Sequence, residues 1–152
     1  MGQGSIIGYE INEKTCQISF YNEKDLEPDT LEVDTDNYQI PLIIGKLRDT
    51  WAYGKEAKRL VTIKDGFTAT RLLSKSLAGD KIEFGEETYD AVWLLSQFIQ
   101  MSLQSFPEID GIVFTVPSLS EEMAQMLRGI AVRMNIDKRN IFIQDYKESF
   151  CN

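Results

Sequence analysis

The sequence predicts a mixed α/β fold in which antiparallel strands come first and parallel strands joined by helices follow. Two observations predict it. Strand-like runs at 5–11 and 15–21 are separated by three polar residues, a length that suits a β-hairpin. Near the C-terminal end, an apolar run, an amphipathic helical pattern and a second short apolar run follow one another. Strand, helix and strand in that order form a crossover between parallel strands, so the whole sheet is predicted to be mixed.

The N-terminal third carries the hairpin and then an acidic stretch. In the run 15–21, Cys16, Ile18 and Phe20 alternate with polar residues, which predicts one buried face. Residues 22–36 read as a loop with a short strand at 31–33, and 40–44 as a strand. Pro41 places that strand at an edge or at its own start.

The middle of the chain alternates short strands and helices, and we expect one domain over 1–152 with a small inserted subregion at about 45–87. The predicted elements are a strand at 51–53, helices at 55–60 and 65–76, a small hairpin from 81–84 and 88–89, and a long helix at 89–106. The wide apolar stripe of the long helix predicts that it packs against a sheet.

The C-terminal third gives the clearest pattern. Residues 111–116 are β-branched or aromatic without alternation, as in a central strand that is covered on both faces. The apolar residues of 120–134 recur with helical spacing, and Ser118 and Glu121 have the spacing of a capping box. A parallel strand at 141–143 and a new helix after Gln144 complete the prediction.

Composition excludes several classes of function. The net charge is −8 and there is no Lys/Arg-rich run, which argues against nucleic acid or a membrane as the main partner. No signal-peptide pattern and no apolar stretch near the ~20 residues of a membrane span occur, so we expect a cytoplasmic protein. Histidine is absent, which removes His-based triads and His metal sites. Cys16 and Cys151 are too few for a disulfide framework and are expected to be small buried hydrophobes.

Three short motifs carry a resemblance to a known superfamily. Gly8-Tyr-Glu-Ile-Asn12 lies in the first hairpin, Phe114-Thr-Val-Pro117 closes the central strand, and Ile143-Gln-Asp-Tyr-Lys-Glu-Ser-Phe150 ends the chain. In this respect the chain resembles the N-terminal lobe of the actin-like ATPases, which include actin, the seventy-kilodalton heat-shock chaperones and the sugar kinases. It also resembles an uncharacterised bacterial branch with a similar Glu-Ser-Phe helix.

The resemblance implies a ribonuclease-H-like sheet and a two-lobed protein with nucleotide in the cleft between the lobes. Since this chain covers only the first lobe, we expect a fragment of a longer protein that is inactive alone. Its partner would be the missing C-terminal lobe of the same chain.

The resemblance also implies site residues in the first hairpin. Glu10 would hold Mg²⁺ through water, and the hairpin with Gly8, Asn12, Glu13, Lys14 and Thr15 would wrap the phosphates of ATP. Four of these positions depart from the superfamily pattern. Glu10 is longer than the aspartate of the superfamily, and Asn12 stands where the superfamily has glycine. Glu13 and Lys14 replace two hydroxyl residues. A solvated hairpin turn with an incidental glutamate is the alternative.

Further site residues are implied at the last strand. Gln144 and Asp145 match the pair that positions or activates the attacking water, and a carboxylate at a strand end can act as general base in phosphoryl transfer. Asp145 is also a suitable helix N-cap, and both roles can hold at once. The superfamily's lysine has no firm match, although Arg71 and Lys75 lie in the corresponding subregion.

Three functions follow as hypotheses, and whether the protein is an enzyme is left open among them. The first is an actin-like protein that binds ATP and Mg²⁺ when full length, with a conformational switch or slow hydrolysis as output. The second is a degenerate, non-catalytic actin-like module for protein interaction or assembly, including a homo-oligomer. The third is a ribonuclease-H-like nuclease with Glu10 and Asp145 as metal ligands, which the net charge of −8 disfavours.

Overall fold

The computed structural model describes residues 4–22, 29–30 and 39–146, which divide into two compact units. Unit 1 comprises Met1–Asn12, Cys16–Gln39 and Ser105–Asn152, and unit 2 comprises Glu13–Thr15 and Ile40–Gln104. The predicted lobe over 1–152 and its insertion at about 45–87 stay predictions. The strand predicted at 31–33, most of the helix predicted after Gln144, and Cys151 lie outside the described residues.

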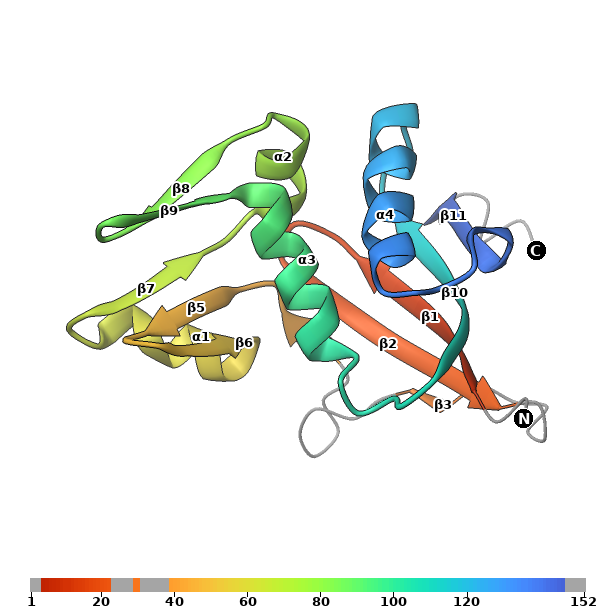
Figure 1. Ribbon diagram of the computed structural model, residues 1–152, viewed down its shortest axis with the longest axis horizontal. Helices are drawn as coiled ribbons and strands as arrows, with labels where there is room; N and C mark the ends of the chain where they lie inside the picture. The colour runs from red at the N-terminus through yellow and green to blue at the C-terminus, as the bar shows by residue number, and fades with distance from the viewer. Residues whose placement is uncertain (1–3, 23–28, 31–38, 147–152) are drawn as a thin grey trace. The chain divides into compact units, whose positions relative to one another are not determined.

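The sheet of unit 1 is mixed, as predicted. Its strands are β1 (Ser5–Ile11), β2 (Thr15–Asn22), β3 (Asp29–Thr30), β10 (Ile109–Val116) and β11 (Ile141–Asp145), in the order β11-β10-β1-β2-β3 (Figure 1). A sixth strand, β4 (Gln39–Pro41), pairs with β2 off this path. β1 pairs with β2 antiparallel and with β10 parallel, and β10 pairs with β11 parallel. The prediction that 111–116 forms a central strand is confirmed, because β10 lies between β11 and β1.

One face of this sheet forms the core of unit 1. Alternate residues along β1, β2 and β10 are buried there: Ile7, Tyr9, Ile11, Cys16, Ile18, Ile112, Phe114 and Val116. The rings of Tyr9 and Phe114 meet edge to face, with centroids 5.7 Å apart. Cys16 Sγ donates to Tyr9 Oη at 3.6 Å, and burial raises the pKa of the Cys16 thiol to about 12. The prediction that Cys16 is a small buried hydrophobe is therefore confirmed.

The amphipathic helix of unit 1 is α4 (Glu121–Arg133), which contacts β11. It buries Met123, Leu127, Ile130 and Ala131, which are members of the predicted stripe. The predicted capping box at Ser118 is wrong. The N-cap is Ser120, whose Oγ accepts from the Met123 N–H at 3.1 Å. Ser120 is two residues further along the chain, so Glu121 becomes the first helical residue instead of the third.

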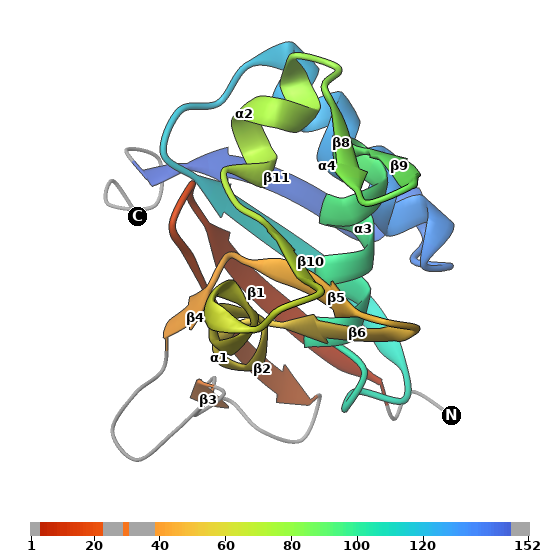
Figure 2. The ribbon, with the colours of Figure 1, turned by 90° about the vertical axis from the view of Figure 1, so that its left-hand side faces the viewer.

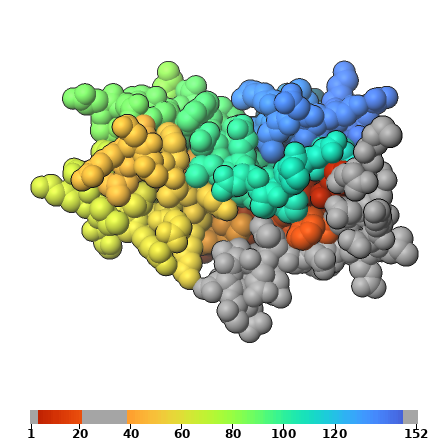
Figure 3. Space-filling view, turned by 60° about the horizontal axis from the view of Figure 1, so that its bottom comes forward, coloured from red at the N-terminus to blue at the C-terminus, as the bar shows by residue number. Residues whose placement is uncertain are grey.

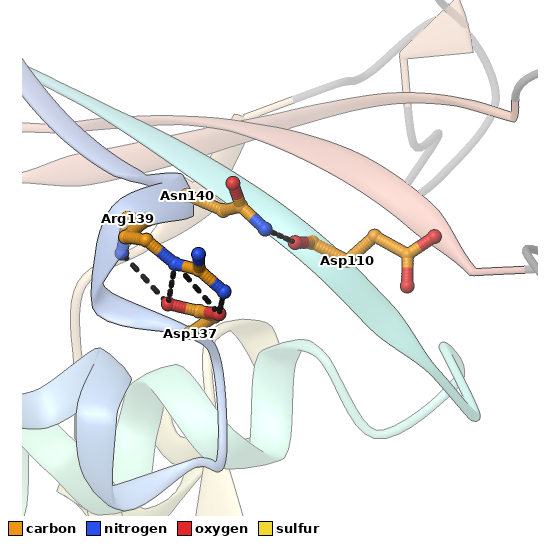
Figure 4. Close-up of polar contacts among 4 residues, drawn as sticks. All are labelled: Asp110, Asp137, Arg139 and Asn140. Carbon is orange, nitrogen blue, oxygen red and sulfur yellow. Dashed lines mark hydrogen bonds and ion pairs between the residues drawn. The ribbon is translucent and has the colours of Figure 1, made fainter.

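A short polar connection sets β11 beside β10. After α4, the 3₁₀ turn η2 (Lys138–Asn140) is capped by Asp137, whose Oδ1 accepts from the backbone N–H of Arg139 at 2.9 Å (Figure 4). Asn140 Nδ2 donates to the backbone oxygen of Asp110 at 3.0 Å. These contacts support the register of Ile112 with Ile141 at the start of β11.

The Asp137–Arg139 pair gives a prediction of pH dependence. Hydrogen bonds from the Arg139 side chain and backbone lower the pKa of Asp137 from 3.8 to about 2. The folded-state pKa is lowered, so the stabilisation by this pair is complete above about pH 4 and is lost as pH falls towards 2. Arg139→Ala is expected to return the pKa of Asp137 towards 3.8, which a carboxyl ¹³C NMR titration measures. An unchanged midpoint would contradict the assignment to Arg139.

Unit 2 is built on a second, smaller sheet. After β4 (Gln39–Pro41), its elements are β5 (Ile44–Leu47), β6 (Thr50–Tyr53), α1 (Lys55–Arg59), the 3₁₀ turn η1 (Leu60–Thr62), β7 (Gly66–Ala69), α2 (Leu72–Leu77), β8 (Lys81–Phe84), β9 (Glu87–Asp90) and α3 (Ala91–Ser102) (Figure 2). The three-stranded sheet has the order β6-β5-β7, and β8 and β9 form a separate hairpin. α3 contacts β5 and β6, so the predicted packing of the long helix against a sheet is confirmed.

Three boundaries in unit 2 differ from the predictions. The helix predicted at 65–76 is wrong in its first half, because 66–69 pairs with β5 as β7 and the helix begins only at Leu72. The strand predicted at 40–44 is two strands, with β4 ending at Pro41 and β5 beginning at Ile44. The helix predicted at 89–106 is shorter, since 89–90 belong to β9 and α3 ends at Ser102.

A lysine among aromatic rings joins the β8–β9 hairpin to the sheet of unit 2. Lys46 Nζ lies 2.9 Å from a Glu87 carboxylate oxygen and 3.0 Å from Tyr89 Oη, and 5.1 Å from the centre of the Trp51 ring. The Lys46 side chain is 11% exposed. The hydrogen bonds to Glu87 and Tyr89 raise the pKa of Lys46 above its usual range, and the same pairing lowers the pKa of Glu87. The Trp93 ring of α3 stacks on Tyr89 with centroids 5.2 Å apart.

Candidate functional site

Four polar side chains share one row across the sheet of unit 1. Glu10 pairs with Gln17 of β2 and with Thr115 of β10, and Thr115 pairs with Gln144 of β11. Paired residues on neighbouring strands point to the same face, so the four side chains lie next to one another. Gln144 Nε2 donates to Thr115 Oγ1 at 3.2 Å. We call Gln17, Glu10, Thr115 and Gln144 the polar row.

The polar row lies at the carboxyl ends of the three parallel strands, on the face opposite the core of unit 1. In open α/β sheets this edge is where ligands bind. Glu10 is exposed, Gln17 and Gln144 are half-buried, and Thr115 is buried. The row thus presents one accessible carboxylate beside amide and hydroxyl oxygens.

The chemistry of the row suits a hard cation that keeps most of its water. Mg²⁺ binds through one or two carboxylates plus substrate phosphates and waters, rather than in a cage of protein ligands. Among the residues that the structure describes, no group of three or more His, Cys, Asp or Glu side chains could hold a metal ion. A cation at Glu10 would therefore need water or a phosphate ligand to complete its shell.

Gly8 lies on the same face as Glu10, two residues earlier. It pairs with Ser19 of β2, and a Cβ added at Gly8 would overlap Ser19 Oγ. Glycine at this position is therefore explained by close packing within the hairpin. Its predicted contact with phosphate stays a prediction.

Glu13, in the turn of the first hairpin, belongs to unit 2 and is hydrogen-bonded to α2 of the same unit. A Glu13 carboxylate oxygen accepts from the backbone N–H of Ser74 at 2.9 Å, and the other carboxylate oxygen accepts from the Ser74 hydroxyl. Ser74 is the third residue of α2, whose N–H has no partner inside the helix. Arg71 at the N-cap has φ 54° and forms no side-chain cap. Glu13 therefore supplies the cap that Arg71 does not.

The neighbours of Glu13 are placed by the backbone. Lys14 O accepts from the Leu42 N–H at 2.8 Å, and the Lys14 side chain is exposed. Asn12 and Thr15 are half-buried where β1 ends and β2 begins. The phosphate contacts predicted for Asn12, Glu13, Lys14 and Thr15 stay predictions.

Asp145 does not belong to the polar row. It pairs with Val116, one residue beyond the Thr115–Gln144 pair, and therefore lies on the opposite face of the sheet. The predicted roles of Gln144 and Asp145 in activating water stay predictions, but the two residues point to different faces. Glu10 and Asp145 likewise lie on different faces, which does not favour the nuclease hypothesis.

Sequence reasoning missed two members of the row, Thr115 and Gln17. Thr115 is the one polar residue in the run 111–116, and that interruption of an apolar strand was an available signal. Gln17 had none, because alternating polar residues are ordinary in a half-exposed strand. Of the candidates for the superfamily's lysine, Arg71 is exposed and Lys75 is half-buried.

The mixed sheet and its parallel crossover define a mixed α/β class of fold. The chain is similar to a solved structure of MamK, described as a non-polymerising mutant bound to AMPPNP, with a TM-score of 0.64 and 11% identity. The similarity covers 95% of this chain and 42% of that chain, so the present sequence spans less than half of the MamK structure. At this identity the likeness shows the fold alone, and it confirms the predicted fold class.

The chain belongs to the family described as "Family of unknown function (DUF5716) C-terminal", which matches residues 27–152. No curated protein matches it. In the described part of the chain, no helix is long and apolar enough to cross a membrane.

Proposed function

We propose that this chain is the first lobe of an actin-like protein, which binds ATP and Mg²⁺ together with a second lobe outside the present sequence. The observation that carries the proposal is the polar row at the carboxyl edge of an actin-like sheet. The similar MamK structure, which holds AMPPNP, supports an adenine nucleotide as the ligand class. The protein would act in the cytoplasm, with the second lobe as its necessary partner.

Each residue of the row has a role in this proposal. Glu10 holds the hydrated Mg²⁺, whose charge offsets that of the nucleotide phosphates. Thr115 fixes the Gln144 side chain through their hydrogen bond, so that the Gln144 carbonyl can orient water. Gly8 and the turn from Asn12 to Thr15 lie along the same hairpin, where backbone N–H groups can meet phosphate.

Calorimetry on the full-length protein tests this proposal with two substitutions that each remove one negative charge. Glu10→Gln is expected to weaken ATP·Mg²⁺ binding by about tenfold or more, because it removes the exposed carboxylate of the row. Asp145→Asn, on the opposite face, is expected to change the affinity by less than about twofold. An absence of ATP·Mg²⁺ binding in the unsubstituted protein, or equal effects of the two changes, would refute the proposed site.

A second candidate function is a non-catalytic actin-like module for protein interaction or assembly. It is favoured by Glu13, whose carboxylate caps α2. Glu13 and Lys14 also stand where the superfamily has two hydroxyl residues. On this alternative the full-length protein binds no nucleotide, and its Glu10→Gln variant keeps all of its partner binding.

A further inference from the structure

The charges of the chain are unevenly divided between the two units. The sequence of unit 1 has six basic and fifteen acidic residues, whereas that of unit 2 has ten basic and nine acidic. Within unit 2, residues 55–64 contain four basic side chains and one acidic one, Glu56. We call residues 55–64 the basic segment; its net charge is opposite in sign to that of the whole chain.

The basic segment also exposes two aliphatic side chains. Val61 is 65% exposed and Ile63 is 42% exposed. Among the large apolar residues that the structure describes, Val61 is the most exposed. Val61 lies in η1, and Ile63 directly follows it. The yellow part of the chain reaches the surface in Figure 3. Exposed apolar side chains that lie close together and are rimmed by polar residues mark contact surfaces on proteins.

Two buried residues hold this surface in place. Ala57 is fully buried and Leu60 is 7% exposed. Leu60 lies against the sheet of unit 2, because a Cβ added at Gly45 would be 2.9 Å from Leu60 Cδ1. The position of Val61 and Ile63 is therefore set before any partner binds, which lowers the entropic cost of binding.

The charged side chains of the segment are only partly paired. Arg59 Nη1 lies 3.0 Å from a Glu56 carboxylate oxygen, and both side chains are exposed. Lys58 and Lys64 are exposed and form no ion pair with the residues that the structure describes. Lys58 precedes and Lys64 follows the two exposed aliphatic side chains in sequence.

We propose that the basic segment binds an acidic segment of a partner protein that carries an aliphatic side chain. Carboxylates of the partner pair with Lys58 and Lys64, and its aliphatic group packs on Val61 and Ile63. A protein fits better than an anionic membrane, because α1 has five residues, too few for a helix that lies in a bilayer surface. This surface is independent of nucleotide.

Fluorescence anisotropy with three labelled twelve-residue peptides tests the proposal on the full-length protein. The first alternates Glu with Leu, the second replaces every Glu by Gln, and the third replaces every Leu by Ser. Binding is expected for the first peptide alone. The double variant Lys58→Glu with Lys64→Glu is expected to weaken it by about tenfold or more, and Val61→Ser with Ile63→Ser by about fivefold.

A matched charge reversal elsewhere gives the control. Lys81→Glu with Lys138→Glu changes the net charge equally at two exposed positions and is expected to leave the affinity within about twofold. All variants change exposed side chains, and circular dichroism checks their folding. The proposal is overturned by equal binding of the three peptides, by equal effects of the two reversals, or by preferential binding to phosphatidylserine vesicles.

Discussion

Phe114→Ala is expected to lower the free energy of unfolding by about 3–5 kcal/mol, the range for deleting a buried aromatic ring. Phe114 has no exposed surface and lies in β10, between two paired strands. Its ring packs against Tyr9 at 5.7 Å, so alanine would leave a cavity beside another large buried side chain. Urea denaturation followed by circular dichroism measures the loss.

Phe142 gives a matched control for this prediction. It lies one strand away on β11, pairs with Val113 and is 57% exposed. Phe142→Ala is therefore expected to cost less than about 1 kcal/mol. Equal losses for the two phenylalanines would contradict the assignment of the core to the face that carries Phe114.

Glu13→Ala is expected to lower the free energy of unfolding by about 1–2 kcal/mol, the usual cost of losing a helix cap. Its carboxylate accepts from both the backbone N–H and the hydroxyl of Ser74. Without it, the first turn of α2 has no side-chain cap, because Arg71 supplies none. Amide hydrogen exchange at Ser74 should become faster, which reports the local loss directly.

Lys14→Ala is the control for Glu13, since Lys14 is adjacent and its side chain is exposed. A change within about 0.5 kcal/mol and unaltered exchange at Ser74 are expected for it. If the Ser74 amide still exchanged slowly in the Glu13→Ala variant, Glu13 would not be the cap of α2. The Glu13 carboxylate would then be available for another role.

Most of the main sheet could be predicted, because its strands are marked by local patterns. The hairpin follows from alternation in Cys16, Ile18 and Phe20, and the crossover follows from two apolar runs around an amphipathic helix. β7 could not be predicted in this way. Residues 66–69 become a strand because they pair with β5, a tertiary interaction that local helical spacing does not report. The choice of Ser120 over Ser118 as cap is a similar case of two equivalent local signals.

The candidate site was predictable only in part. Glu10 and Gln144 were found from short motifs, but their presence in one row depends on the register of three strands. The same register separates Gln144 from Asp145, which sequence alone presents as a pair. The contact between Glu13 and Ser74 spans 61 residues of sequence, and no spacing rule connects them.

The most direct test of the proposed function is to locate the metal. Mn²⁺ would replace Mg²⁺ in the full-length protein with ATP, and its paramagnetic relaxation of backbone amides would be measured by NMR. The proposal predicts that the amide signals of Glu10, Thr115 and Gln144 broaden strongly. Those of Asp110 and Asn140, near the opposite ends of β10 and β11, should broaden much less. Unchanged signals at the polar row, or stronger broadening at Asp110 and Asn140, would contradict a nucleotide-bound metal at Glu10.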